Sequence, residues 1–149
     1  MALLDTDRVA AYLSGHMPGF EGPLEARQFP SGQSNPTFLI RATSGSYVLR
    51  RKPPGELLKS AHAVDREFRV QSALAQSAVP VARMHVLCED DAVIGSAFYV
   101  MEHLEGRNFD DPRLPGLTPP ERAAIYDEMN RVLAALHDVD IGAVGLSEY

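Results

Sequence analysis

Two charged residues, Arg50 and Glu67, have types and surroundings that could bind a phosphate group together. Arg50 falls in a strand-like segment whose alternation places it on the same face as Val48. Glu67 lies three residues from both Val64 and Val70 at the border of an apolar helical stripe. If that helix packs on the sheet, its carboxylate can hold the guanidinium, a planar group suited to phosphate oxygens. The sequence leaves open that the two are independent surface charges, because two further basic residues follow Arg50 directly.

A polar loop ahead of a strand-like segment is the second candidate. It consists of Ser31, Gly32, Gln33, Ser34 and Asn35. A small loop with a glycine can turn its backbone N–H groups towards phosphate oxygens, and the serine and asparagine side chains add donors. The loop has a single glycine and no GxGxxG pattern, so an ordinary polar hairpin turn is the better interpretation of this loop taken alone.

The third candidate is the stretch FYVMEHLEG, residues 98–106, in which an apolar strand runs into a connector containing a glycine. Backbone C=O and N–H groups freed at such a connector can pair with the edge of an adenine ring. The pattern also suits a hinge between two lobes. The alternative is a core strand that leaves its sheet, with Met101 serving only as core filler.

The helices and strands that must position these candidates can be predicted from the spacing of apolar residues and from the Gly and Pro residues that interrupt it. The pattern predicts a helix over 6–14, strands over 24–29, 35–42 and 46–52, a helix over 60–77, strands over 81–88 and 97–101, and a second long helix from 118. This order predicts an α+β fold with one five-stranded, mainly antiparallel sheet and the 60–77 helix packed on a face. Thr118 and Glu121 have the spacing of a capping box.

Composition excludes several classes of protein. The 149 residues are 45% hydrophobic, and no apolar run is long enough to cross a membrane. The start lacks a secretory signal, and the single Cys88 excludes an intrachain disulfide, so a cytoplasmic protein is expected. The net charge of −6 argues against binding to nucleic acid.

The charge is spread unevenly along the chain. Residues 1–88 carry a net +3 and residues 89–149 a net −9. The basic residues concentrate between Arg41 and Lys59. Such a cluster could attract a ligand that bears phosphate, or it could be the solvated edge of a strand.

Five stretches together resemble one family. They are FPSGQSN (29–35), YVLRRKPPG (47–55), DREFRV (65–70), FYVMEHLEG (98–106) and LAALHDVD (133–140). In order and element type they resemble the small lobe of a protein-kinase-like fold, and in detail the aminoglycoside phosphotransferase and choline kinase-like family. The LRRKPPG stretch resembles the branch that includes kinase-like domains fused to acyl-CoA dehydrogenases.

The resemblance implies a kinase that uses ATP and Mg²⁺ to phosphorylate a hydroxyl of a small molecule. It implies that the 31–35 loop covers the triphosphate, and that Arg50 takes the place of the usual strand lysine beside Glu67. It further implies that Met101 borders the adenine pocket. The backbone C=O of Glu102 and N–H of Leu104 would then pair with the adenine edge.

The catalytic part of the family pattern is not found in these 149 residues. The nearest match to His-Gly-Asp-x-x-x-x-Asn starts at His137, but the residue five past Asp138 is Ala143 instead of Asn. We therefore assign no catalytic residue and no metal ligand, and expect the Mg²⁺ ligands in a C-terminal part that follows this chain. The chain alone is expected to bind ATP weakly and to be inactive.

These expectations divide the chain into a nucleotide-binding lobe over 1–104, a hinge over 105–117 and the start of a second lobe over 118–149. The apolar stripe of the 118–138 helix predicts a homodimer through that helix. Two alternatives stay open. One is a non-catalytic, pseudokinase-like module that works through the exposed helix face, and the other is an unrelated α+β binding domain.

Overall fold

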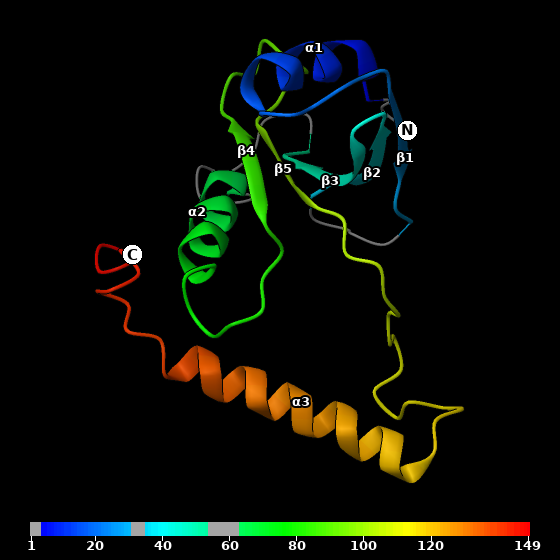
Figure 1. Cartoon of the computed structure of the whole chain (residues 1–149), viewed down its shortest axis with the longest axis vertical. Coiled ribbons are helices and arrows are strands. Elements are labelled where there is room, and N and C mark those ends of the chain that lie inside the picture. The colour runs from blue at the N-terminus through cyan, green and yellow to red at the C-terminus, as the bar shows by residue number, and fades with distance from the viewer. Residues whose placement is uncertain (1–3, 31–34, 54–62) are drawn as a thin grey trace. The chain divides into compact units, whose positions relative to one another are not determined.

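One antiparallel sheet of five strands makes up much of the fold (Figure 1). It carries the candidate residues Arg50, Met101 and Glu102. The computed structural model describes residues 4–30, 35–53 and 63–149. The strands are β1 (Leu24–Gln28), β2 (Thr37–Ala42), β3 (Gly45–Arg51), β4 (Met84–Cys88) and β5 (Phe98–Glu102). They lie in the order β1-β2-β3-β5-β4, and every neighbouring pair is antiparallel. With the helices α1 (Thr6–His16), α2 (Val64–Leu74) and α3 (Pro119–His137), this confirms the predicted α+β class.

The two faces of the sheet pack against different helices, because side chains alternate along each strand. On one face, Val9 and Leu13 of α1 pack with Phe38, Ile40 and Leu49 of the sheet. This face is called the α1 face below. Cys88, Phe98 and Val100 belong to the same core, and Cys88 is a free, buried cysteine.

The opposite face packs against α2 and is called the α2 face. Its core consists of Val64, Ala97 and Tyr99, with Phe68, Met84, Leu87 and Met101 packed around them. Because alternate residues of β3 point to opposite faces, Val48 and Arg50 lie on the α2 face while Leu49 and Arg51 lie on the α1 face. Strand phase therefore selects Arg50 among the basic residues of β3.

Some helices and strands begin or end at other residues than predicted, at points where the regular backbone hydrogen bonding stops. Helix α2 ends at Leu74 and not at Ser77, because the backbone N–H and the hydroxyl of Ser77 both donate to the Leu74 carbonyl, at 2.9 and 2.7 Å. Strand β4 begins at Met84 and not at residue 81, because its neighbour β5 ends at Glu102, opposite Arg83. Residues 60–62 of the predicted helix lie outside the described residues.

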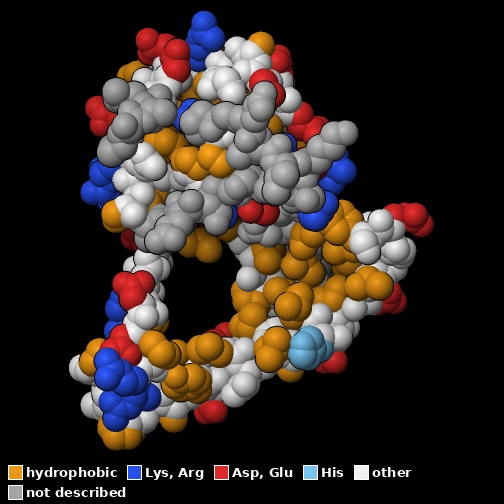
Figure 2. All heavy atoms as spheres, turned by 180° about the vertical axis from the view of Figure 1, so that it is seen from behind, with side chains coloured by type: hydrophobic (Ala, Val, Ile, Leu, Met, Phe, Trp, Pro, Cys, Tyr) orange, Lys and Arg blue, Asp and Glu red, His pale blue; other side chains and the backbone are white. Residues whose placement is uncertain are grey.

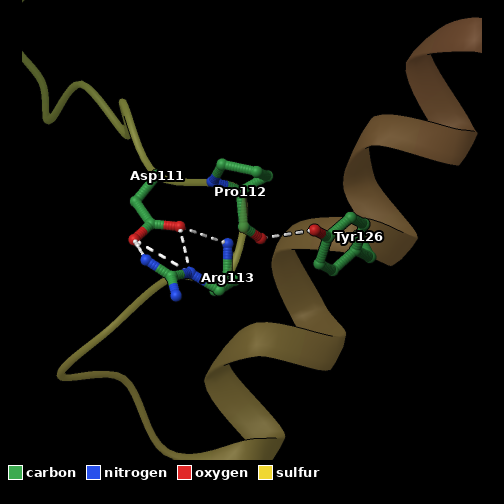
Figure 3. Close-up of polar contacts among 4 residues, drawn as sticks. All are labelled: Asp111, Pro112, Arg113 and Tyr126. Carbon is green, nitrogen blue, oxygen red and sulfur yellow. Dashed lines mark hydrogen bonds and ion pairs between the residues drawn. The ribbon is translucent and has the colours of Figure 1, made fainter.

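The chain divides into two compact units, formed by residues 1–72 with 82–103, and by 73–81 with 104–149. Within the second unit, α3 begins with the predicted capping box, in which Thr118 N–H donates to Glu121 Oε2 at 2.8 Å and Thr118 Oγ1 accepts from Glu121 N–H at 3.5 Å. The segment before α3 is tied to it by the Tyr126 hydroxyl, which donates to the Pro112 carbonyl at 2.6 Å (Figure 3).

Helix α3 carries no buried residue in this structure. Its exposed apolar side chains are Tyr126, Met129, Leu133 and Leu136, with exposed fractions between 44% and 59%. Figure 2 shows hydrophobic side chains gathered along this helix. Among the helices that the structure describes, none is long and apolar enough to span a bilayer.

Candidate phosphate-binding site

The predicted pairing of Arg50 with Glu67 is confirmed. Arg50 Nε lies 2.8 Å from Glu67 Oε2, and Arg50 Nη2 donates to Glu67 Oε1 at 3.4 Å. The Nε–H does not point at Oε2, so the shorter contact is an ion pair without a hydrogen bond. The two side chains keep 30% and 33% of their surface accessible. The pair is thus sheltered on the α2 face yet open to a ligand.

Two further residues converge on the same carboxylate. Asn35 Nδ2 donates to Glu67 Oε1 at 3.0 Å, and the Tyr99 hydroxyl donates to Glu67 Oε2 at 3.0 Å. Asn35 precedes β2, Arg50 comes from β3 and Tyr99 from β5, so α2 is joined at Glu67 to three separate parts of the sheet. Cross-strand register explains the meeting, because Arg50 is paired directly with Tyr99.

Burial and the nearby carboxylate keep the Tyr99 hydroxyl protonated. Desolvation contributes most to the raised pKa of Tyr99, and the charge of Glu67 and the hydrogen bond to it raise the pKa further. Arg50 and a hydrogen bond with Gln71 act in the opposite direction. Tyr99 is therefore a hydrogen-bond donor to Glu67 throughout the neutral pH range.

This shift predicts a loss of stability at alkaline pH. An unfolded tyrosine loses its proton near its ordinary pKa of 10.0, whereas folded Tyr99 keeps it, so deprotonation favours the unfolded state. Burial likewise raises the pKa of Tyr12, to about 12. Through these two tyrosines, the free energy of unfolding should fall as the pH rises above 10.0, and the fall should be smaller in Tyr99→Phe. Urea unfolding on both sides of that pH checks this, and an equal fall in Tyr99→Phe would contradict it.

An apolar row runs across the α2 face beside Arg50. Register pairs Leu39 with Val48, and Val48 with Met101. Met101 also packs on the α2-face core, so both interpretations of this residue, pocket border and core filler, are compatible with its position. Leu39 and Val48 are buried, with 5% and 7% of their surface exposed, whereas Met101 is partly exposed. The face therefore places apolar side chains next to a held guanidinium.

A hollow of about 190 Å³ lies farther along the same face, against β1 and β2. It is lined by Glu25, Ala26, Arg27, Leu39 and Arg41. Ligand pockets usually measure about 300 Å³ or more, so this hollow by itself is too small for a nucleotide.

Arg51 differs from Arg50 in the face of the sheet on which it lies, in its exposure and in its contacts. It lies on the α1 face with 5% of its surface exposed, and its guanidinium carbon stands 5.9 Å from the centre of the Phe38 ring. Burial lowers the pKa of Arg51. A cation enclosed in this way cannot reach a ligand on the α2 face.

The remaining predicted site residues fall into two groups. Ser31, Gly32, Gln33 and Ser34 lie outside the described residues. Glu102 ends β5, where its backbone N–H donates to the Arg83 carbonyl at 2.8 Å and its carboxylate accepts from Arg83 N–H at 3.2 Å. Leu104 has a mostly exposed side chain. Contact of Glu102 and Leu104 with adenine stays a prediction.

Sequence reasoning missed Tyr99 as part of the site. It treated this residue as one of a run of buried strand residues, and it assigned Asn35 to the phosphate loop. A polar hydroxyl at the centre of an otherwise apolar strand was the available signal, because a buried hydroxyl needs a partner. Its partner could not be named without knowing that β3 and β5 are neighbours.

Comparison with known proteins decides the family. The phosphotransferase enzyme family matches residues 25–149. The chain belongs to this family. A crystal structure from Ralstonia eutropha JMP134, provisionally described as an aminoglycoside phosphotransferase, is 51% identical to this phosphotransferase chain with a TM-score of 0.84. That match covers 99% of the present chain and 42% of the other. The protein-kinase-like fold expected from the sequence is thereby shown.

Curated relatives of this phosphotransferase chain are much longer. Acyl-CoA dehydrogenase family member 11 of Rattus norvegicus is 48% identical in an alignment of 149 positions, which covers 97% of this chain and 19% of that protein. Acyl-CoA dehydrogenase family member 10 of Mus musculus is 49% identical over 144 residues, or 96% of this chain and 14% of that protein. The chain thus spans less than a fifth of these relatives, whose names agree with the branch that the LRRKPPG stretch resembles.

Proposed function

We propose that this chain is the nucleotide-binding part of an ATP-dependent kinase that phosphorylates a hydroxyl group of a small molecule. The observation that carries the proposal is the Arg50 guanidinium, held at 2.8 Å from Glu67 on the face that also bears the apolar row. A guanidinium can bind two phosphate oxygens side by side, and the family match makes a nucleotide the expected phosphate donor.

In this proposal the residues of the α2 face bind and orient ATP. Arg50 neutralises charge on the phosphates, and Glu67 keeps the guanidinium in place. The apolar row supplies a surface for the base, with Met101 at its border, while the loop 31–35 covers the triphosphate. Glu102 and Leu104 would contribute backbone groups to the adenine edge.

Mg²⁺ would help to bind the phosphates and to stabilise charge during transfer. Among the described residues, no three His, Cys, Asp or Glu side chains are grouped so that they could hold a metal ion. The described residues therefore do not fit a protein-built Mg²⁺ site. We propose that the Mg²⁺ ligands and the catalytic Asp and Asn are not among these 149 residues.

The acceptor is proposed from the relatives. Since they are named as acyl-CoA dehydrogenases, an acyl thioester that carries a hydroxyl group is the first acceptor class to assay, ahead of amino sugars and amino alcohols.

The single cysteine, Cys88, favours a cytoplasmic setting.

A second candidate function is an interaction module without catalysis. The exposed apolar side chains of α3 favour it, because contiguous apolar surface often marks a protein interface. In this alternative, two copies would associate through the helix at 118–138. Sedimentation that shows a concentration-dependent dimer, together with no response to any nucleotide, would favour this alternative over the kinase.

The test of the proposed function is transfer of labelled γ-phosphate from ATP to a panel of hydroxyl acceptors. The chain 1–149 should bind ATP without transferring phosphate, whereas a polypeptide that continues through the family's catalytic loop should phosphorylate at least one acceptor. Transfer by residues 1–149 alone would contradict the proposal that these residues bind ATP but do not include the catalytic residues. Absence of transfer by the longer polypeptide, despite bound ATP, would favour a non-catalytic role.

A further inference from the structure

Each oxygen of the Glu67 carboxylate accepts a well-formed hydrogen bond from a neutral partner. Asn35 and Tyr99 each donate to one of its two oxygens at 3.0 Å. The contacts from Arg50 are less well formed, since one is a misaligned 2.8 Å ion pair and the other a 3.4 Å hydrogen bond. Hydrogen bonds weaken steeply with poor angle and length. The amide and the phenol, one on each oxygen, therefore hold the plane of the carboxylate in place.

Asn35 and Tyr99 are also too buried to touch a ligand with their side chains. Asn35 has 2% of its surface exposed and Tyr99 has 1%. Tyr99 packs against Phe68 of α2, with ring centres 6.1 Å apart. The Asn35 carbonyl accepts from the Thr37 hydroxyl at 3.0 Å, which ties the backbone of Asn35 to the start of β2. Both donors are thus rigid parts of the core that face the carboxylate.

Among the described residues, Glu67 is the hydrogen-bond partner of the guanidinium, and most of its donors stay available for a ligand. Arginine has five N–H donors. Glu67 accepts a hydrogen bond from only one atom of the group, Nη2. A lysine would hold the same carboxylate through a single freely rotating ammonium. For the planar guanidinium, the direction of the remaining donors depends on the plane of the carboxylate that it faces.

We propose that Asn35 and Tyr99 are positioning residues, which hold the Glu67 carboxylate and, through it, aim the Arg50 guanidinium at the phosphates of the nucleotide. The proposal rests on the proposed function and deepens it. It reassigns the Asn35 side chain from a direct phosphate donor to a residue that acts through Glu67. It gives Tyr99, which was not predicted in the site, a role in phosphate affinity.

The test compares ATP with adenosine, which shares the base and ribose but lacks phosphates. Tyr99→Phe removes one hydroxyl and leaves the packed ring, so the fold should persist. Loss of one hydrogen bond in the positioning chain should weaken ATP binding by about three- to tenfold. Adenosine binding should stay within about twofold, because the base surface is untouched. A role in folding alone would not separate the two ligands.

A double-mutant cycle tests whether Tyr99 acts through Glu67. In a Glu67→Ala background, the further change Tyr99→Phe should leave ATP affinity unaltered. Tyr47→Phe is the matched control, because its hydroxyl contacts only Ser44 among the described residues, at 3.3 and 3.1 Å, and lies on the α1 face. That variant should keep the ratio of ATP to adenosine affinity. Asn35→Asp, which turns an oxygen towards the carboxylate, should weaken ATP binding more than Tyr99→Phe does.

Either of two contrary results would overturn the inference that Asn35 and Tyr99 act on Arg50 through Glu67. Unchanged ATP affinity in Tyr99→Phe, or equal weakening of ATP and adenosine, would show that Tyr99 does not act on the phosphates. An effect that persists in Glu67→Ala would show that it does not act through Glu67. If the wild-type chain binds ATP and the variants give one of these contrary results, only the positioning role of Asn35 and Tyr99 is overturned. No binding of ATP by the wild type would overturn the proposed function as well.

Discussion

An Arg50→Ala variant is expected to lose ATP affinity by about ten- to a hundredfold, while keeping its fold. The guanidinium is held by a carboxylate on the α2 face and is partly accessible. Charge-assisted hydrogen bonds to phosphate are worth about 1.5–3 kcal/mol, which corresponds to that range of affinity. Removing Arg50 also leaves the charge of Glu67 facing the phosphates, which adds repulsion. Equilibrium titration with a fluorescent ATP analogue measures the change.

Two variants make this result specific. Arg50→Lys keeps the charge but loses the planar fork, so its ATP affinity should fall between those of the wild type and Arg50→Ala. Arg8→Ala removes an arginine that also pairs with a carboxylate, Asp5, at 3.5 Å, but from α1. It should bind ATP like the wild type. Equal affinity of Arg50→Ala and Arg8→Ala would contradict the assignment of Arg50.

A Phe98→Ala variant is expected to lower the free energy of unfolding by about 3–5 kcal/mol. Phe98 is fully buried at the centre of the α1-face core and meets Tyr12 edge-to-face, with ring centres 5.5 Å apart. Truncation leaves a cavity that neighbouring strands cannot fill. Domains are commonly stable by only about 5–15 kcal/mol, so the loss should be visible as a large drop in the urea midpoint. The chain has no tryptophan, and circular dichroism is the suitable signal.

The matched control is Phe109→Ala, which removes the same side chain from a site that is 44% exposed. Its cost should stay below about 1 kcal/mol, because little apolar surface is uncovered. Phe98→Leu, which refills part of the space, should lie between the two. Equal destabilisation by Phe98→Ala and Phe109→Ala would show that the α1-face core is not the main source of stability.

Local patterns were sufficient to predict much of this structure. The succession of strands and helices along the chain, the capping box at Thr118 and the choice of Arg50 over Arg51 all follow from spacing and phase within single segments. The pairing of Arg50 with Glu67 needed one further assumption, that the helix packs on the sheet face bearing Arg50. The hydrophobic positions of α2 supported that assumption.

The rest of the site depends on contacts between distant segments. Tyr99 meets Glu67 only because β3 and β5 are neighbours, so that residues 49 positions apart in the sequence are paired. No local pattern around Tyr99 indicates that neighbour. Asn35 was assigned to the phosphate loop because its side chain could add a donor to phosphate oxygens, whereas the structure buries it with the Glu67 carboxylate as its partner.

The most direct measurement is a crystal structure of the chain with a non-hydrolysable ATP analogue. The account predicts that a guanidinium nitrogen of Arg50 lies within about 3.2 Å of a phosphate oxygen while the contacts of Glu67 with Asn35 and Tyr99 persist. A phosphate chain bound away from the α2 face, with Arg50 still engaged by Glu67 alone, would contradict it.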